Sequence, residues 1–285
     1  METVLRSSET SVVVSPDRPT VLIEEKISAA AWSALAEALR DADRGPLCRE
    51  AEKRVGAGAD VLEVNIGAPD VNEIVWLPRA VPMSIDTVDF KALEAALATH
   101  REHAPEGKPL IDSVNGEERY LEAILPLAAN HRAAVGGMAL DDDGAPELPE
   151  ARVTVARKII ERAEREGVPP EGMIIDCMAL SMSTDPEACR VTLEAIRRVR
   201  GELGVNLTPE PCNVSFGLPE RDKVDWAFTA MAIQNGVNCP IVDVTRDHRF
   251  TMTVDVILGE DLQGFHLIES YRVEHGEDQL HSQPV

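Results

Sequence analysis

The sequence predicts an α/β chain folded as one (β/α)8, or TIM, barrel, and three observations support this fold class. Eight short apolar, β-branched runs alternate with segments of helical period along the 285 residues. Such alternation is typical of parallel strands joined by helical crossovers. The length suits one large α/β domain. A doubly wound open sheet is the alternative, but no GxGxxG pattern follows the first run.

The expected strands are runs rich in Val, Ile and Leu, most of which end in polar residues. They cover residues 20–25, 61–67, 82–86, 109–114, 133–140, 173–180, 205–215 and 239–244. Between them, segments such as "FKALEAALATHRE" and "DPEACRVTLEAIRRVR" repeat apolar residues at i, i+3, i+4 and i+7, which predicts amphipathic helices. Asp185-Pro186 before one segment and Gly236 after another are helix caps.

The outer helices near the N-terminus are less regular. The first is expected within residues 31–59, with a break at Gly45-Pro46, and a short second helix is expected around residues 72–81. We divide the chain into an N-terminal extension (1–19), the barrel (20–272) and a polar C-terminal tail (273–285).

The charge and cysteine content exclude several classes of partner. Fifty acidic residues against 28 basic ones give a net charge of −22, which disfavours nucleic acid and anionic membrane surfaces. The sequence contains neither a membrane-spanning run nor a signal peptide pattern, so we expect a cytoplasmic protein. The five cysteines are widely spaced and form no CxxC motif, which indicates reduced thiols.

Polar residues gather where the expected strands end, and in such barrels chemistry takes place at these ends. They are Glu25, Glu63, Asn65, Asp86, Asp112, Asn115, Asp176, Asn213, Ser215 and Asp243. Any one of them can cap a helix instead, but capping does not need so many converging acids and amides. Carboxylates and amides without nearby lysines suit a ring edge with an exocyclic amine and a ring N–H, as in purines and pterins.

The motifs "VLEVNIG", "PMSIDTVDFKALEAAL", "PLIDSVNGE", "MIIDCMAL" and "CNVSFGLPER" resemble those of pterin-binding methyltransferases, in the same order and over about residues 20–270. The resemblance implies transfer of a methyl group between N5 of tetrahydrofolate, or 5-methyltetrahydrofolate, and the cobalt of a corrinoid (cobalamin) carried by a partner protein. Relatives in this family include the folate domain of cobalamin-dependent methionine synthase and the folate components of O-demethylase systems. The resemblance also implies that the protein forms a homodimer.

The resemblance assigns roles to individual residues. Asp86 and Asp176 match the carboxylates that hold the pterin ring, and Asn213 matches the amide beside N5, which makes Asn213 the expected catalytic residue. The remaining expected pterin contacts are Glu25, Asn65, Asp112, Ser215 and Arg221. No metal ligand is expected.

Four positions depart from the family pattern. Glu24 stands where glycine is usual, Glu63 where aspartate is usual, Asp112 where asparagine is frequent, and Cys177 where proline is frequent. These differences concern the detail of folate recognition.

Three other functions compete with methyl transfer. A dihydropteroate synthase would need a lysine after the "IID" strand and a late "SRK" run, and this chain has neither. A folate-binding protein without transfer activity would fit the departures from the pattern. A zinc–thiolate methyltransferase would use Cys177, Cys212 and Cys239. However, strand alternation is expected to turn Cys177 and Cys212 away from the inward-facing Asp176 and Asn213.

Overall fold

Eight parallel strands form a ring in the computed structural model of the chain, which describes residues 1–28, 45–65 and 80–275. Neighbouring strands follow the chain order, except that the last strand lies beside the first. They are β3 (Ile23–Ser28), β4 (Val61–Asn65), β5 (Met83–Asp86), β6 (Leu110–Asn115), β7 (Ala134–Met138), β8 (Met173–Asp176), β9 (Asn206–Leu207) and β10 (Ile241–Val242). Each predicted strand overlaps one of these, although β3 and β6 extend beyond the predicted ends at residues 25 and 114.

The two strands at the ends of this order, β9 and β10, have two residues each. Backbone hydrogen bonds join their segments, since the amide of Ile241 donates to the Pro209 carbonyl at 2.9 Å and that of Cys239 donates to the Leu207 carbonyl at 3.2 Å. These bonds close the ring, so the predicted single barrel is confirmed.

The expected strand 205–215 is mostly wrong. After β9 the chain enters a short 3₁₀ helix, η3 (Pro211–Asn213), because Pro209 and Pro211 cannot donate to a strand ladder. This difference changes the direction of the side chains that follow.

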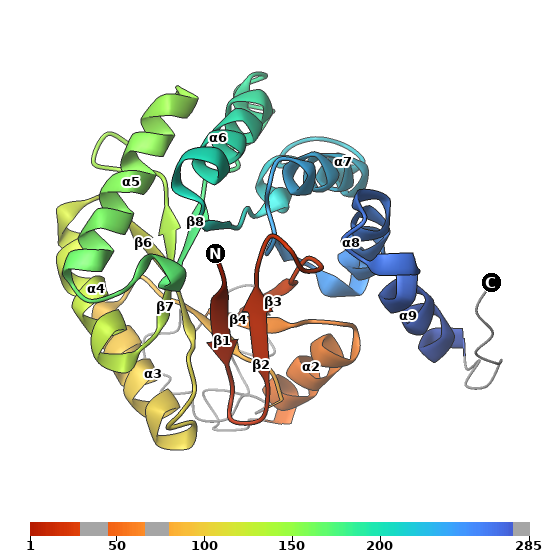
Figure 1. Cartoon of the computed structure of the whole chain (residues 1–285), viewed down its shortest axis with the longest axis horizontal. Helices are drawn as coiled ribbons and strands as arrows, with labels where there is room; N and C mark the ends of the chain where they lie inside the picture. The colour runs from red at the N-terminus through yellow and green to blue at the C-terminus, as the bar shows by residue number, and fades with distance from the viewer. Residues whose placement is uncertain (29–44, 66–79, 276–285) are drawn as a thin grey trace.

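Helices surround the ring, as Figure 1 shows. They are α2 (Gly45–Gly56), α3 (Phe90–His103), α4 (Glu118–His131), α5 (Pro149–Arg165), α6 (Ala188–Leu203), α7 (Arg221–Gln234), α8 (Val244–Leu258) and α9 (Phe265–His275), with short 3₁₀ turns η2 (Pro170–Gly172) and η4 (Leu262–Gly264). Most of the short helix expected around residues 72–81 lies outside the described residues. Residues 31–44 of the first expected outer helix also lie outside them.

The barrel core has two faces because successive strand side chains point to opposite sides of the sheet. Outward residues such as Ile85, Ile111 and Val135 pack against the helices in the largest apolar cluster. Inward residues at the start of the strands form a separate aliphatic layer inside the ring. That layer includes Ile23, Val61, Leu110, Ala134, Ile174 and Ile241.

An antiparallel hairpin of β1 (Thr3–Arg6) and β2 (Ser11–Val14) covers this inner layer at the N-terminal ends of the strands (Figure 1). Leu5 and Val14 are fully buried against the aliphatic layer. Asn206 of β9 fixes the hairpin, since its Nδ2 donates to Thr3 Oγ1 at 2.8 Å and to the Val14 carbonyl at 3.0 Å. No strand was predicted within residues 1–19, because two four-residue strands carry too little periodicity to be recognised.

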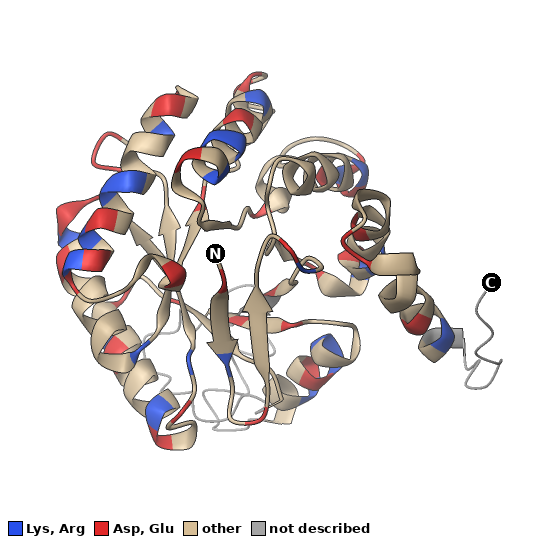
Figure 2. Ribbon diagram, in the orientation of Figure 1, with Lys and Arg blue, Asp and Glu red and all other residues tan. Residues whose placement is uncertain are grey.

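The C-terminal helix α9 runs to His275, so it includes the first three residues, 273–275, of the expected tail. Among the described residues, no helix combines the length and apolarity needed to cross a membrane. Figure 2 shows that basic and acidic residues are interspersed along outer helices such as α5 and α6.

Candidate functional site

Four strands carry the same inward pattern, an aliphatic residue followed two positions later by an acid. The pairs are Ile23 with Glu25, Val61 with Glu63, Leu110 with Asp112, and Ile174 with Asp176. The aliphatic members pack together in the apolar cluster inside the ring, so the acids, two residues further along each strand, form the next layer toward the C-terminal ends of the strands. The barrel interior therefore changes from aliphatic to acidic within one layer.

A second row of predicted site residues crosses strands β4, β5 and β6. Asn65 is in register with Asp86, and Asp86 is in register with Asp112. The Asn65 Nδ2 donates to Asp86 Oδ2 at 2.5 Å. Asp86 does not cap α3, because Asp89 does so by accepting from the amide of Lys91 at 2.8 Å. The Asp86 carboxylate is therefore available to a ligand.

Glu63 and Asp112 form a pair of buried carboxyl groups at the mouth of the barrel. Burial, together with the charges of Asp86 and Asp176, raises the pKa of Asp112 to about 7. Burial and the neighbouring Asp112 raise the pKa of Glu63 well above its usual value, and the two side chains are hydrogen bonded. Two carboxyl groups can hydrogen bond only when one keeps its proton. The sequence placed Glu63 among the polar strand-end residues and showed its departure from the family pattern, but it did not indicate a pairing with Asp112.

Asp176 lies deep in the same layer. Burial, reinforced by Glu210, raises its pKa to about 7, while a hydrogen bond from the Met178 amide at 2.7 Å works in the opposite direction. The nearby Arg152 guanidinium is turned to the carbonyls of Pro146, Cys177 and Met178. Asp176 thus keeps a carboxylate edge without a bidentate arginine partner.

The loop after β9 brings an acid that the sequence analysis missed. Asn213 Nδ2 donates to Glu210 Oε2 at 2.8 Å, and the charge of Glu210 raises the pKa values of Asp86, Asp112 and Asp176. Glu210 therefore faces the same space as the strand acids and sets the orientation of the Asn213 amide. Its position between Pro209 and Pro211, just past a strand, was the available signal.

Ser215 and Arg221 support this loop. Arg221 Nε donates to Ser215 Oγ at 3.0 Å, and its Nη2 donates to the Cys212 carbonyl at 2.6 Å. Ser215 is fully buried. The hydrogen bonds of both side chains thus go to the loop, although a direct pterin contact had been predicted for each.

Three of the polar strand-end residues have structural roles. Glu24, which departs from the family pattern, points outward, where it pairs with Arg54 at 3.2 Å and accepts from the Val244 amide at 3.0 Å. Asp243 caps α8, and Asn115 accepts from the Glu117 amide before α4. These are helix-end contacts.

The cysteines do not gather into a thiolate site. Cys177 is buried in the outer apolar cluster and Cys239 in the inner aliphatic layer. Cys212 does face the mouth, contrary to the alternation argument, because its segment is a 3₁₀ helix and not a strand. In the described part of the chain, the ligand atoms that lie within 4.8 Å of one another as a possible metal group belong to Glu25, Glu210 and Cys212. Burial and these two acids raise the pKa of the Cys212 thiol, which favours its neutral form.

Six acids surround the mouth of the barrel, and their field determines what the site can do. They are Glu25, Glu63, Asp86, Asp112, Asp176 and Glu210. Carboxylates accept hydrogen bonds from amines and ring N–H groups, and they stabilise positive charge on a bound ligand. The site therefore fits a ligand with several donors that gains positive charge during the reaction.

Comparisons with known proteins agree on one family. A family model described as "Pterin binding enzyme" matches residues 42–243. The methylcorrinoid:tetrahydrofolate methyltransferase of Eubacterium limosum is 26% identical over 258 residues, which cover 85% of this chain and 92% of that protein. The methionine synthase of Mycobacterium leprae (strain TN) is 26% identical over 263 residues, 84% of this chain but only 21% of that protein.

A solved structure supports the fold independently. The dihydropteroate synthase of Yersinia pestis matches 91% of this chain and 100% of its own, with a TM-score of 0.65 and 16% identity. At this level of identity the match concerns the barrel architecture.

Proposed function

Since the chain belongs to the pterin binding enzyme family, as its sequence predicted, we propose that it transfers a methyl group between N5 of tetrahydrofolate and the cobalt of a corrinoid protein. The observation that carries this proposal is the layer of carboxylates at the mouth of the barrel. The similarity to a methylcorrinoid:tetrahydrofolate methyltransferase over most of both chains supports the same activity.

The carboxylates give the pterin ring its recognition. In the proposal, Asp86 and Asp176 accept hydrogen bonds from the exocyclic amine and ring N–H groups, which a pyrimidinone edge presents side by side. Asn65 holds Asp86 in place. Glu63 and Asp112 share one proton, so this pair both donates and accepts, as the usual asparagine would at position 112. The two departures from the family pattern thereby compensate each other.

The chemistry depends on positive charge at N5. A tertiary amine is a poor leaving group, so the bond from N5 to the methyl carbon breaks only as N5 takes a proton or a strong hydrogen bond. The corrinoid supplies the nucleophilic cobalt, and the protein contributes orientation and polarity. Glu210 holds Asn213 at the mouth, and the surrounding acids favour the protonated N5.

The rim of the mouth suits a corrinoid protein as partner. Four large apolar side chains, Val88, Leu148, Met182 and Phe216, are exposed on the loops that follow β5, β7, β8 and β9. Exposed apolar groups around a polar site are typical of a protein-binding rim. A partner docked there would place its cobalt above the carboxylate layer.

The proposal is tested with 5-methyltetrahydrofolate and cob(I)alamin under anaerobic conditions, and with methylcobalamin and tetrahydrofolate for the reverse direction. The visible spectrum of the corrinoid should change in at least one direction. In Asn213→Ala the rate should fall by about 10²-fold, because a donor near the reacting atom is lost. Asn235→Ala at the end of α7 is the control. Tight folate binding without transfer would instead favour a pterin-binding protein.

A dihydropteroate synthase-like activity is a weaker candidate. The segments 176–185 and 213–221 contain no lysine, and the similarity to solved dihydropteroate synthases concerns the fold. Release of pyrophosphate from a pterin diphosphate in the presence of 4-aminobenzoate would support this alternative.

We also propose a cytoplasmic homodimer. Helix α9 projects from the side of the barrel (Figure 1). Large apolar side chains are exposed on the end of α8, on η4 and on α9, namely those of Ile257, Leu262, Phe265 and Val273. Such a patch is costly on a monomer surface. Light scattering should give twice the chain mass of 31.0 kDa, and Phe265→Glu should return the monomer.

A further inference from the structure

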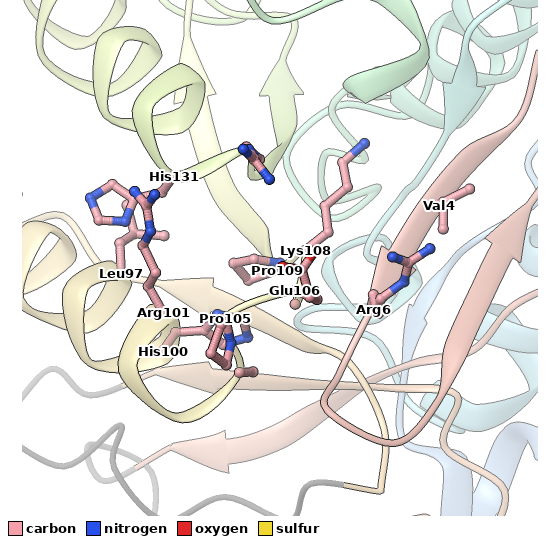
Figure 3. Close-up of a pocket in the computed structure, with 13 residues that line it drawn as sticks. Val4, Arg6, Leu97, His100, Arg101, Pro105, Glu106, Lys108, Pro109 and His131 are labelled. Atoms are coloured by element: carbon pink, nitrogen blue, oxygen red, sulfur yellow. The ribbon is translucent and has the colours of Figure 1, made fainter.

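A cavity of about 220 Å³ opens at the opposite end of the barrel from the acidic mouth. Strand β1, the end of α3 with the loop after it, and the end of α4 form its walls (Figure 3). The proposed methyltransferase has no use for this cavity, because the aliphatic layer inside the ring separates it from the mouth.

The cavity is lined by cations, although the whole chain has a net charge of −22. Its ionisable lining consists of Arg6, Arg101, Lys108, Arg132, His100 and His131, with Glu106 as the acid. Figure 3 shows Arg101 and His131 on one side of the cavity and Lys108 and Arg6 on the other. Four permanent positive charges from three separate segments thus surround one hollow.

These cations are not paired with acids at ion-pair distance within the described part of the chain. None of the four Arg and Lys side chains forms an ion pair there; Arg101 donates to the Asn130 carbonyl at 3.2 Å and Arg6 to Ser11 Oγ at 3.0 Å. Burial and then Arg6 lower the pKa of Lys108, although Glu171 opposes this shift. Burial and then Arg101 lower the pKa of His131, although Glu94 opposes this shift. The positive groups therefore repel one another.

The backbone holds these repelling groups in place. Arg6 and Lys108 exchange two backbone hydrogen bonds, of 2.9 and 2.8 Å, which attach the hairpin to the loop between α3 and β6. The buried His100 side chain lies against Gly107, where an added Cβ would come within 2.6 Å of its Cε1. A site with fixed donors loses little entropy when it binds a ligand.

We propose that this cavity binds a small polyvalent oxyanion of the phosphate class. Guanidinium and ammonium groups on opposite walls match the several oxygens of a phosphate or diphosphate group. The volume admits a ligand of that size. Binding neutralises the mutual repulsion and clamps the N-terminal hairpin to α3 and α4, so the ligand stabilises the fold.

The proposal is tested by isothermal titration of the full chain with pyrophosphate, without folate and in a low-salt buffer free of phosphate. We expect saturable binding of one pyrophosphate per chain, weakened by added salt because exposed charges are screened. Lys108→Met and Arg101→Gln should each lower the affinity at least tenfold, as expected for loss of a charged hydrogen bond. The matched controls Lys91→Met and Arg49→Gln, at exposed positions outside the cavity, should bind like the wild type.

A second readout covers variants of altered stability. Millimolar pyrophosphate should raise the melting temperature of the wild type and of both controls, but not that of Lys108→Met. Absence of saturable binding to the wild type would overturn the proposal, as would equal affinity in Lys108→Met. Tighter binding of citrate than of pyrophosphate would overturn the assignment to phosphates. Because folate is absent, these outcomes do not depend on the proposed methyl transfer.

Discussion

The two ends of the barrel carry opposite charge and are built differently. At the C-terminal ends of the strands, acids occupy alternate inward positions of regular strands and form one layer. At the N-terminal ends, the cations of the cavity lie on a hairpin, a loop and the ends of two helices. Between them lies the aliphatic layer inside the ring, against which Leu5 and Val14 pack.

This contrast between the two ends of the barrel indicates which kind of ligand each end can bind. Acids at inward positions of the strands are held close together, and burial with the charge of Asp112 raises the pKa of Glu63. That arrangement suits recognition of a ring with fixed donors and a reaction that develops positive charge. The cations of the cavity come from a hairpin, a loop and helix ends and surround one hollow, which suits an anion bound mainly by charge.

Substitutions in the aliphatic layer between the two ends should have the greatest effect on stability. Leu5→Ala should lower the free energy of unfolding by about 2–5 kcal/mol, because it leaves a cavity in the fully buried inner layer. Urea unfolding measures the change, and Val12→Ala on the half-buried face of β2 should cost less. Folate binding by the folded variant should stay unchanged. Equal costs for the two variants would mean that the hairpin does not close the barrel.

The shared proton predicts an unusual dependence of stability on pH. The pKa of Asp112 rises from 3.8 to about 7 on folding, so between these values the folded state holds a proton that the unfolded state releases. The free energy of unfolding should therefore fall as the pH rises from 5 to 8. Asp112→Asn removes the charge and should be more stable than the wild type at pH 8, by about 1–3 kcal/mol.

Thermal unfolding between pH 5 and 8 measures this effect, with Asp142→Asn on an exposed loop as the control. The advantage of Asp112→Asn should shrink toward pH 5, where the wild-type carboxyl is protonated. Parallel pH profiles for the wild type and Asp112→Asn would show that Asp112 stays ionised throughout this range, which contradicts its raised pKa.

Weakening the hydrogen bonds that Arg221 makes to the loop at the mouth should have the least effect on activity. Arg221→Lys keeps the charge but cannot donate to both Ser215 and the Cys212 carbonyl. The loss of one hydrogen bond, about 1 kcal/mol, should slow methyl transfer several-fold while folate affinity changes little. Stopped-flow spectroscopy of the corrinoid measures the rate, and Arg49→Lys on α2 is the control. A large loss of folate affinity would place Arg221 in direct contact with the pterin.

The sequence predicted the barrel and the strand acids because both follow from periodicity. Asp86, Asp112 and Asp176 end apolar strands, and alternation with the residue two positions earlier determines their inward direction. The proton shared by Glu63 and Asp112 was not predictable in this way, since it depends on the register between strands. Glu210 and Cys212 were missed or misplaced because their proline-flanked segment is a 3₁₀ turn, where alternation does not apply.

In the proposed function, the carboxylate layer binds the pterin and the opposite end of the barrel does not. Isothermal titration of 5-methyltetrahydrofolate into the wild type, Asp176→Asn and Lys108→Met tests it most directly. Asp176→Asn keeps the shape of the side chain but removes its charge, so folate affinity should fall by about 10- to 100-fold. Lys108→Met should bind folate like the wild type. Unchanged folate affinity in Asp176→Asn would show that the pterin does not bind at the carboxylate layer.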